Sequence, residues 1–190
     1  MRIKLLFFVM IALSLVSCAE TPQQISVLPP LATDNLIVGQ GQSVALTVTD
    51  ERADPVLGSR GGVYAETSVI TLQPGFEKKL QEEISRKLAQ RNFIIDPMSL
   101  EVTWQVKLLE LSYEIVPVDQ LKDNIVVKGK LGFEMNNANK TFTKSYGATR
   151  VQPMFGKPSD KKNSDLVNMV IADMVNAMLS DQQVADFLND

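Results

Sequence analysis

The sequence predicts an α+β domain over residues 42–190: a mixed, mostly antiparallel sheet of four to five strands, with two main helices packed on one face. Two patterns favour this class. Several segments alternate apolar and polar residues with the period of a half-buried strand, and two longer segments repeat apolar residues every three or four positions, as an amphipathic helix does.

The first expected elements are two strands and a helix. Residues 44–48 alternate with the strand period, a polar loop follows, and residues 63–72 are expected to form a second strand or an extended edge segment. Residues 74–91 then predict a helix, because its apolar residues recur at every fourth position. Pro74 suits the first helical position, and Asn92 suits the left-handed residue that ends a helix.

The strongest strand pattern covers residues 100–115. Its apolar residues occupy even positions up to Leu108 and odd positions from Leu109 onward. A one-residue shift sends side chains to the opposite face, so we expect a β-bulge or bend there, unless the two halves serve different packing surfaces. Two more alternating segments, residues 125–135 and 140–151, follow across an Asn-rich turn and predict an antiparallel meander.

Two helices are expected at the carboxyl end. Residues 164–179 carry a broad apolar arc, which predicts a helix buried on more than one side. A short helix is expected over residues 181–189, and the spacing of Ser180 and Gln183 is that of a capping box at its start.

Composition narrows the chemistry. The chain has no histidine and one cysteine, which removes the commonest general base and metal ligand and argues against zinc, haem and thiol-dependent catalysis. A formal charge of −3 gives no basic footprint for nucleic acid. We therefore predict no enzyme activity, no catalytic residue, no metal and no cofactor.

The amino terminus resembles that of a bacterial lipoprotein. Residues 1–17 have a positive start and an apolar core too short to span a bilayer of about 30 Å, which predicts a signal peptide. Leu15-Val16-Ser17 before Cys18 resembles a lipobox, and the resemblance implies acylation of Cys18. An ordinary secretory signal and an uncleaved anchor helix are the alternatives. Residues 18–41 are expected to form the lipidated cysteine and an extended tether, whose few apolar residues could dock on the domain.

The residue after the cysteine bears on which membrane is used. In enteric-type bacteria an aspartate there favours retention in the inner membrane, and this chain has Ala19. The resemblance therefore implies a lipid anchor in the outer membrane, with the domain facing the periplasm.

The loop from Asp50 to Arg60 holds the densest charge next to a strand end. Its possible partner-binding residues are Asp50, Arg52, Asp54 and Arg60. Arg52 could clamp an anionic partner, or the carboxylates could hold Ca²⁺, although the spacing lacks the glycine and distal glutamate of an EF-hand. The alternative is a local arginine–carboxylate pair that fixes the turn.

A second basic group lies near the carboxyl end, around a Pro- and Gly-containing loop at residues 152–162. It consists of Arg150, Lys157, Lys161 and Lys162. These side chains could meet lipid headgroups or lipopolysaccharide phosphates, or simply face solvent.

Several segments together resemble the YajG-like family of uncharacterised proteobacterial lipoproteins over essentially the whole chain. They are the lipobox at Cys18, residues 48–54, the helix at 76–91 and the helices at 163–190. The family has no established catalytic residues, so the resemblance transfers none.

Two functional hypotheses follow. The first is a non-enzymatic outer-membrane lipoprotein that presents a binding or assembly surface to an envelope protein, a glycan or lipopolysaccharide. The second is an envelope hydrolase that acts on peptidoglycan through Asp50, Glu51 or Asp54, because glycoside hydrolysis uses two carboxylates at a defined separation.

Overall fold

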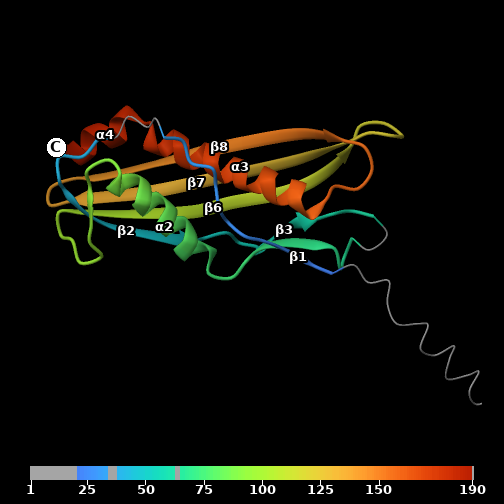
Figure 1. Cartoon of the computed structure of the whole chain (residues 1–190), viewed down its shortest axis with the longest axis horizontal. Helices are drawn as coiled ribbons and strands as arrows, with labels where there is room; N and C mark the ends of the chain where they lie inside the picture. Colours follow the sequence, from blue (N-terminus) through green and yellow to red (C-terminus); the bar gives the residue numbers. More distant parts are fainter. Residues whose placement is uncertain (1–20, 34–37, 63–64, 190) are drawn as a thin grey trace, which may run out of the picture.

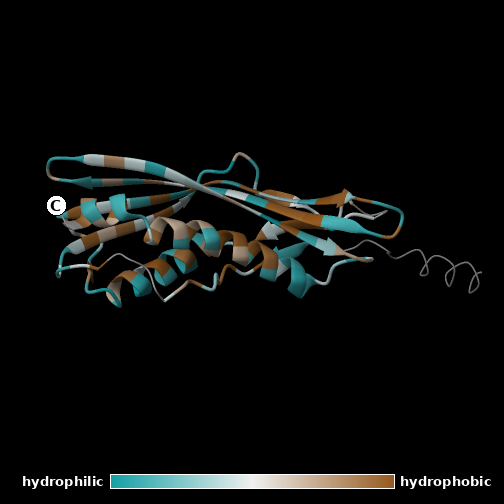
Figure 2. Ribbon diagram, turned by 90° about the horizontal axis from the view of Figure 1, so that it is seen from above, coloured by the Kyte–Doolittle hydropathy of each residue, from teal (hydrophilic) through white to brown (hydrophobic). Residues whose placement is uncertain are grey.

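The computed structural model describes residues 21–33, 38–62 and 65–189, and they form two layers, a sheet with helices on one face (Figures 1 and 2). Cys18 and the predicted signal peptide lie outside the described residues. The elements in chain order are β1 (Gln23–Ile25), β2 (Ser43–Asp50), β3 (Val56–Ser59), β4 (Val69–Leu72), α2 (Phe76–Ala89), β5 (Ile94–Ile95), β6 (Val102–Pro117), β7 (Asp123–Asn137), β8 (Thr141–Met154), α3 (Asp160–Leu179) and α4 (Gln182–Asn189).

The α+β class and the mixed sheet are confirmed, but the sheet has eight strands where four to five were expected. Its longest part is the predicted antiparallel meander β6–β7–β8. On its other side β6 pairs in parallel with β2 along its first half and with β3 at Tyr113. The three unpredicted strands, β1, β3 and β5, are only two to four residues long, which is too short for an alternating pattern to stand out.

The predicted bulge in β6 is confirmed. The register between β6 and β7 shifts between Leu108 and Glu110. Before the shift the even residues face the core, as fully buried Trp104 does, and after it the odd residues Leu111 and Tyr113 do. The bulge therefore keeps one face of a 16-residue strand apolar along its whole length.

The two main helices cover that face. The four apolar residues of α2 that recur at every fourth position are all buried, and Asn92 has the predicted left-handed backbone, with φ of 66°. Helix α3 begins at Asp160, four residues before the expected start, because the Ser159 hydroxyl accepts a hydrogen bond from the Lys162 amide at 3.3 Å.

The capping residue predicted for the last helix is wrong by one position. At the start of α4 the Asp181 carboxylate accepts a hydrogen bond from the Gln183 amide at 2.8 Å, and the Asp181 carbonyl accepts one from the Val184 amide at 3.1 Å. Aspartate is as good an N-cap as serine. Its carboxylate also accepts hydrogen bonds from Lys144 and Tyr146 of β8, so this cap joins α4 to the sheet.

The segment expected to be a tether contains a part that packs on the domain. β1 pairs with β4, and Ile25 and Val27 are fully buried. Beyond β1, the Leu28 amide donates to Asn168 of α3 at 2.7 Å. Residues 21–33 therefore belong to the domain, which begins before the expected boundary at residue 42. No helix within the described ranges is both long and apolar enough to cross a membrane.

Candidate functional site

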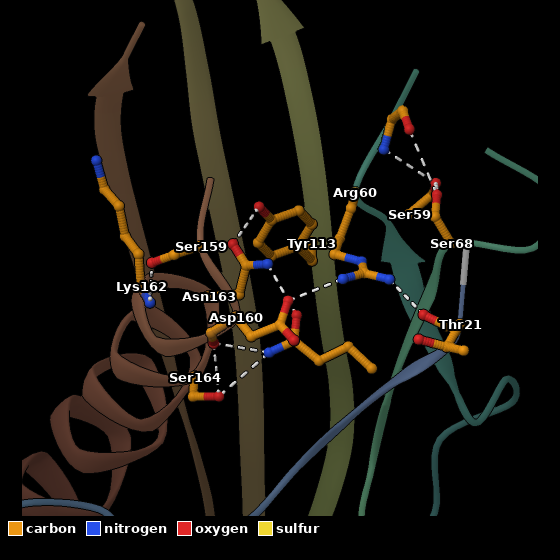
Figure 3. A network of polar contacts seen from close by, with 12 residues as sticks. Thr21, Ser59, Arg60, Ser68, Tyr113, Ser159, Asp160, Lys162, Asn163 and Ser164 are labelled. Carbon is orange, nitrogen blue, oxygen red and sulfur yellow. Dashed lines mark hydrogen bonds and ion pairs between the residues drawn. The ribbon is translucent and has the colours of Figure 1, made fainter. Parts of the chain in front are cut away.

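A network of polar side chains joins β1, β3, β6 and α3 at one end of the sheet (Figure 3). Its central members are Gln23, Arg60, Tyr113 and Asn163, all of them buried. Burying a polar group is costly unless it forms hydrogen bonds, so the partners of these four residues define what the network does.

Arg60 follows β3 and connects three segments. Its Nη1 donates to Asp160 Oδ1 at 2.8 Å, and its Nη2 donates to the carbonyl oxygen of Thr21. The position of Arg60 depends on Gly58, because a Cβ at residue 58 would lie 1.9 Å from the carbonyl oxygen of Tyr113. Only glycine lets β3 approach β6 this closely, and this approach brings Arg60 to the beginning of α3.

The other three residues form a continuous chain of hydrogen bonds. The Tyr113 hydroxyl donates to Asn163 Oδ1 at 2.8 Å, and Asn163 Nδ2 donates to Gln23 Oε1 at 2.9 Å. Gln23 Nε2 donates to the carbonyl oxygen of Asp160 at 2.7 Å and lies 3.3 Å from Ser164 Oγ. Burial raises the pKa of the Tyr113 hydroxyl above its ordinary value of 10, so ionisation does not compete with its role as a donor.

A second set of contacts shapes the connection between β3 and β4. The hydroxyls of Ser59 and Ser68 lie 2.9 Å apart, and the Ser59 hydroxyl also donates to the carbonyl oxygen of Ala65. The Arg60 amide donates to the carbonyl oxygen of Ser68 at 3.0 Å. These bonds fix the backbone on both sides of Arg60 and limit the directions its side chain can take.

The groups of this network hold chain segments in place relative to one another. Its groups are amides, a guanidinium, a phenol and a carboxylate that accepts from the guanidinium, all held by named partners. In the part of the chain that the structure describes, no cluster of three or more histidine, cysteine, aspartate or glutamate residues could hold a metal ion. What the network holds is Thr21, three residues after Cys18 in the sequence.

The four residues predicted for partner binding occupy two places. Arg60 belongs to the network, whereas Arg52 donates from Nε and Nη2 to both carboxylate oxygens of Asp50 at 2.8 and 2.7 Å. The Arg52 side chain is 4% exposed and lies over the ring of Phe76. Asp54 accepts a hydrogen bond from the Val56 amide at 2.8 Å. The contact between Arg52 and Asp50 is the kind of local arginine–carboxylate pair that the sequence offered as the alternative to partner binding.

The carboxylate of Asp50 is held in its ionised form. Burial raises the pKa of this carboxylate. The hydrogen bonds from the side chain and the amide of Arg52, together with the charge of Arg52, lower it by a larger amount, so the pKa lies below its ordinary value. A general acid needs a raised pKa. The lowered pKa of Asp50 therefore does not suit the general-acid role that glycoside hydrolysis requires of one carboxyl group. The exposed neighbour Glu51 lies 3.6 Å from Lys107.

Sequence reasoning missed Gln23, Tyr113 and Asn163 as members of a site. For Asn163 a signal existed, since it lies four and seven residues before Val167 and Val170 and so shares their buried face of α3. A polar residue on such a face needs a buried partner. Gln23 follows Pro22 in a segment without periodicity and gave no signal.

Comparison with known proteins identifies the family. The model of a family described as uncharacterized lipoprotein matches residues 29–189. The chain belongs to this family.

Similar proteins are known in Escherichia coli and Xanthomonas. The chain is 27% identical over 191 residues to the uncharacterized lipoprotein YajG of Escherichia coli strain K12, covering 97% of this chain and 96% of the relative. The YajG protein of strain CFT073 gives the same values. The crystal structure of protein XCC0632 from Xanthomonas campestris has a TM-score of 0.53 at 10% identity, covering 87% of this chain and 95% of that one, and thus shares the fold.

The first prediction concerns Arg60 as the residue that holds Thr21. Replacing it in Arg60→Met removes the charged donor, and we expect a loss of about 1.5 kcal/mol in the local stability of β1, or roughly tenfold faster amide hydrogen exchange at residues 23–27. Arg150→Met is the matched control, because Arg150 also pairs with an aspartate of α3, Asp173, but at an exposed site. Unchanged exchange in Arg60→Met would contradict the proposed role.

The second prediction concerns the pH dependence of the Asp50–Arg52 pair. Because folding lowers the pKa of Asp50, the pair stabilises the fold above the unfolded-state value of about 3.9, and the contribution is lost as pH falls through the folded-state pKa. We expect Asp50→Asn to lower the free energy of unfolding by about 1–3 kcal/mol at pH 7. The difference from wild type in urea unfolding should shrink below about pH 4; a difference that stays constant with pH would refute the pairing.

Proposed function

We propose that the protein is a lipoprotein anchored in the outer membrane through lipid on Cys18, and that its periplasmic domain is a non-enzymatic binding or envelope-assembly module. The observation that carries the proposal is the single cysteine directly after Leu15-Val16-Ser17, in a chain that belongs to a lipoprotein family. Stable anchoring requires more than one acyl chain, which the diacylglyceryl and amide-linked chains of a lipobox cysteine supply.

The contacts of the charged residues in the Asp50–Arg60 loop support a non-enzymatic module. Arg52 and Asp50 satisfy each other, Asp54 holds a turn, and Arg60 holds Thr21 against α3. Each of the predicted partner-binding groups thus has a structural task. The proposed partner, an envelope protein, a glycan or lipopolysaccharide, would meet other parts of the surface.

The far end of the sheet is one such part. β6 is 16 residues long, so its two ends are roughly 50 Å apart at about 3.3 Å per residue. At the end away from Thr21 lies a hollow of about 650 Å³ between the β7–β8 turn, the beginning of β6 and α4. On a protein anchored at residue 18 with the Thr21 end toward the bilayer, this end would reach farthest into the periplasm.

The third prediction tests the anchor. In Cys18→Ser the thiol that would be acylated is absent, so the full-length protein should leave the membrane fraction and keep its folded circular dichroism spectrum. In wild type, mass spectrometry of the mature amino terminus should find an acylated cysteine at residue 18. A wild-type protein with a free thiol and an intact leader would overturn the proposal.

The choice of membrane is tested by one neighbouring substitution. Ala19→Asp should move the acylated protein from the outer to the inner membrane, whereas Ala19→Ser should leave it in the outer membrane. Sucrose-gradient separation of the two membranes reads the result. Equal distribution of the two variants would contradict sorting by residue 19.

The fourth prediction tests the binding module. A photo-crosslinking amino acid in place of Ala138, which borders the hollow, should give a discrete adduct in intact cells, identified by mass spectrometry of peptides, glycans and lipid A. The control position is Lys128 on the outer face of the sheet, which is also exposed. Adducts equally frequent at both positions, or absent from both, would count against a specific partner at this end.

A further inference from the structure

Large apolar side chains are exposed on the loops at the Thr21 end of the sheet. Leu121, between β6 and β7, is 81% exposed, and Phe155, directly after β8, is 78% exposed. Val118, in the same loop as Leu121, and Val151, near the end of β8, are also exposed. An exposed surface tolerates single apolar residues, but several gathered at one end of a sheet are typical of a contact with a membrane or with another protein.

The strand register shows that the two loops are neighbours. Pro117, the last residue of β6, pairs with Asp123, and Asp123 pairs with Met154, the last residue of β8. The β6–β7 loop and the beginning of the β8–α3 loop therefore project beyond the same end of the sheet. Figure 1 shows them as the yellow and orange loops on the side where β1 begins.

The register also places the amino-terminal segment at this end. Gln23 pairs with Ile70, Ile70 with Gly58, and Gly58 with Tyr113. The chain before Gln23 thus leaves the sheet level with the last residues of β6. The contact of Arg60 with the carbonyl oxygen of Thr21 fixes this exit.

The reach of the chain sets the distance to a bilayer. Thr21 comes three positions after Cys18, and even a fully extended chain spans at most about 10 Å over three positions. The four residues from Tyr113 to Pro117 cover a similar length at about 3.3 Å each. Lipid on Cys18 would therefore hold the loop tips at the level of the headgroups, and the tether expected over residues 18–41 would not separate the domain from the membrane.

Charge at this end is nearly balanced. The basic residues include Arg60, Lys122, Lys157, Lys161 and Lys162, and the acidic ones include Glu66, Asp119, Asp123, Asp160 and Asp165. Asp160 pairs with Arg60, and Asp165 pairs with Lys161. Because positive and negative charges are nearly equal in number here, we expect the contact with lipid to depend on the apolar side chains and not on a basic patch.

We propose that Leu121 and Phe155 insert into the leaflet that holds the anchor, so that the domain stands on the bilayer with the long axis of the sheet directed away from it. The inference rests on the proposed acylation of Cys18. The two side chains would lie in the interfacial region of a phospholipid leaflet, which apolar side chains typically enter to a depth of about 5–10 Å.

The test uses the full-length acylated protein in vesicles of phosphatidylethanolamine and phosphatidylglycerol. Leu121→Cys and Phe155→Cys provide single reactive thiols for an environment-sensitive fluorophore, because acylation consumes the thiol of Cys18. Leu100→Cys is the matched control, since Leu100 is 91% exposed at the opposite end of the sheet. Vesicles that carry nitroxide lipids report contact with the leaflet by quenching.

The expected result is a blue shift and loss of emission at positions 121 and 155, with neither at position 100. Vesicle flotation with unquenched probes at 121 and 155 would overturn insertion and leave the anchor intact. Quenching at all three positions would overturn the upright orientation. If the protein does not float with the vesicles and carries two fluorophores per chain, the thiol of Cys18 is free. This result would overturn the anchor and the inference together.

Discussion

One buried guanidinium group determines how the beginning of this domain is arranged. Arg60 contacts Thr21, 39 residues earlier, and Asp160, 100 residues later. These contacts join the amino-terminal segment, the edge of the sheet and the beginning of α3 into a single unit. Because a guanidinium group carries a charge, its removal from water is tolerated only with such partners in place. The position of Thr21 follows from this requirement.

Local sequence patterns predicted the parts of the fold that are long and regular. The change from even to odd apolar positions at Leu108 and Leu109 identified the bulge in β6, since a buried face can remain continuous only if the register shifts. The short strands escaped prediction for the opposite reason. β3 has a single buried apolar side chain, Leu57, and a glycine whose purpose is to let β3 approach Tyr113. Tertiary contacts, and not local pattern, make this segment a strand.

The same distinction separates the predicted and the missed parts of the site. Asp50 and Arg52 are two residues apart, so their pairing could be considered from the sequence. The partners of Arg60 and Asn163 come from distant segments, and no spacing along the chain indicates them. Gln23 illustrates the limit most clearly. In a segment with Pro22 and no periodicity it resembled part of a tether, yet it is buried between β4 and α3 because Asn163 requires an acceptor.

The orientation of β1 has a mechanical consequence. β1 pairs with β4 along a line that begins at the exit of the amino-terminal chain, so in the proposed upright orientation a pull from the membrane would act along the strand axis. The pull would then load the β1–β4 pairing in shear. The three residue pairs of β1 and the Arg60 contact would have to break together, and not one after another. A three-residue strand can in this way withstand tension from a membrane-bound end that would easily peel it away if applied across the sheet.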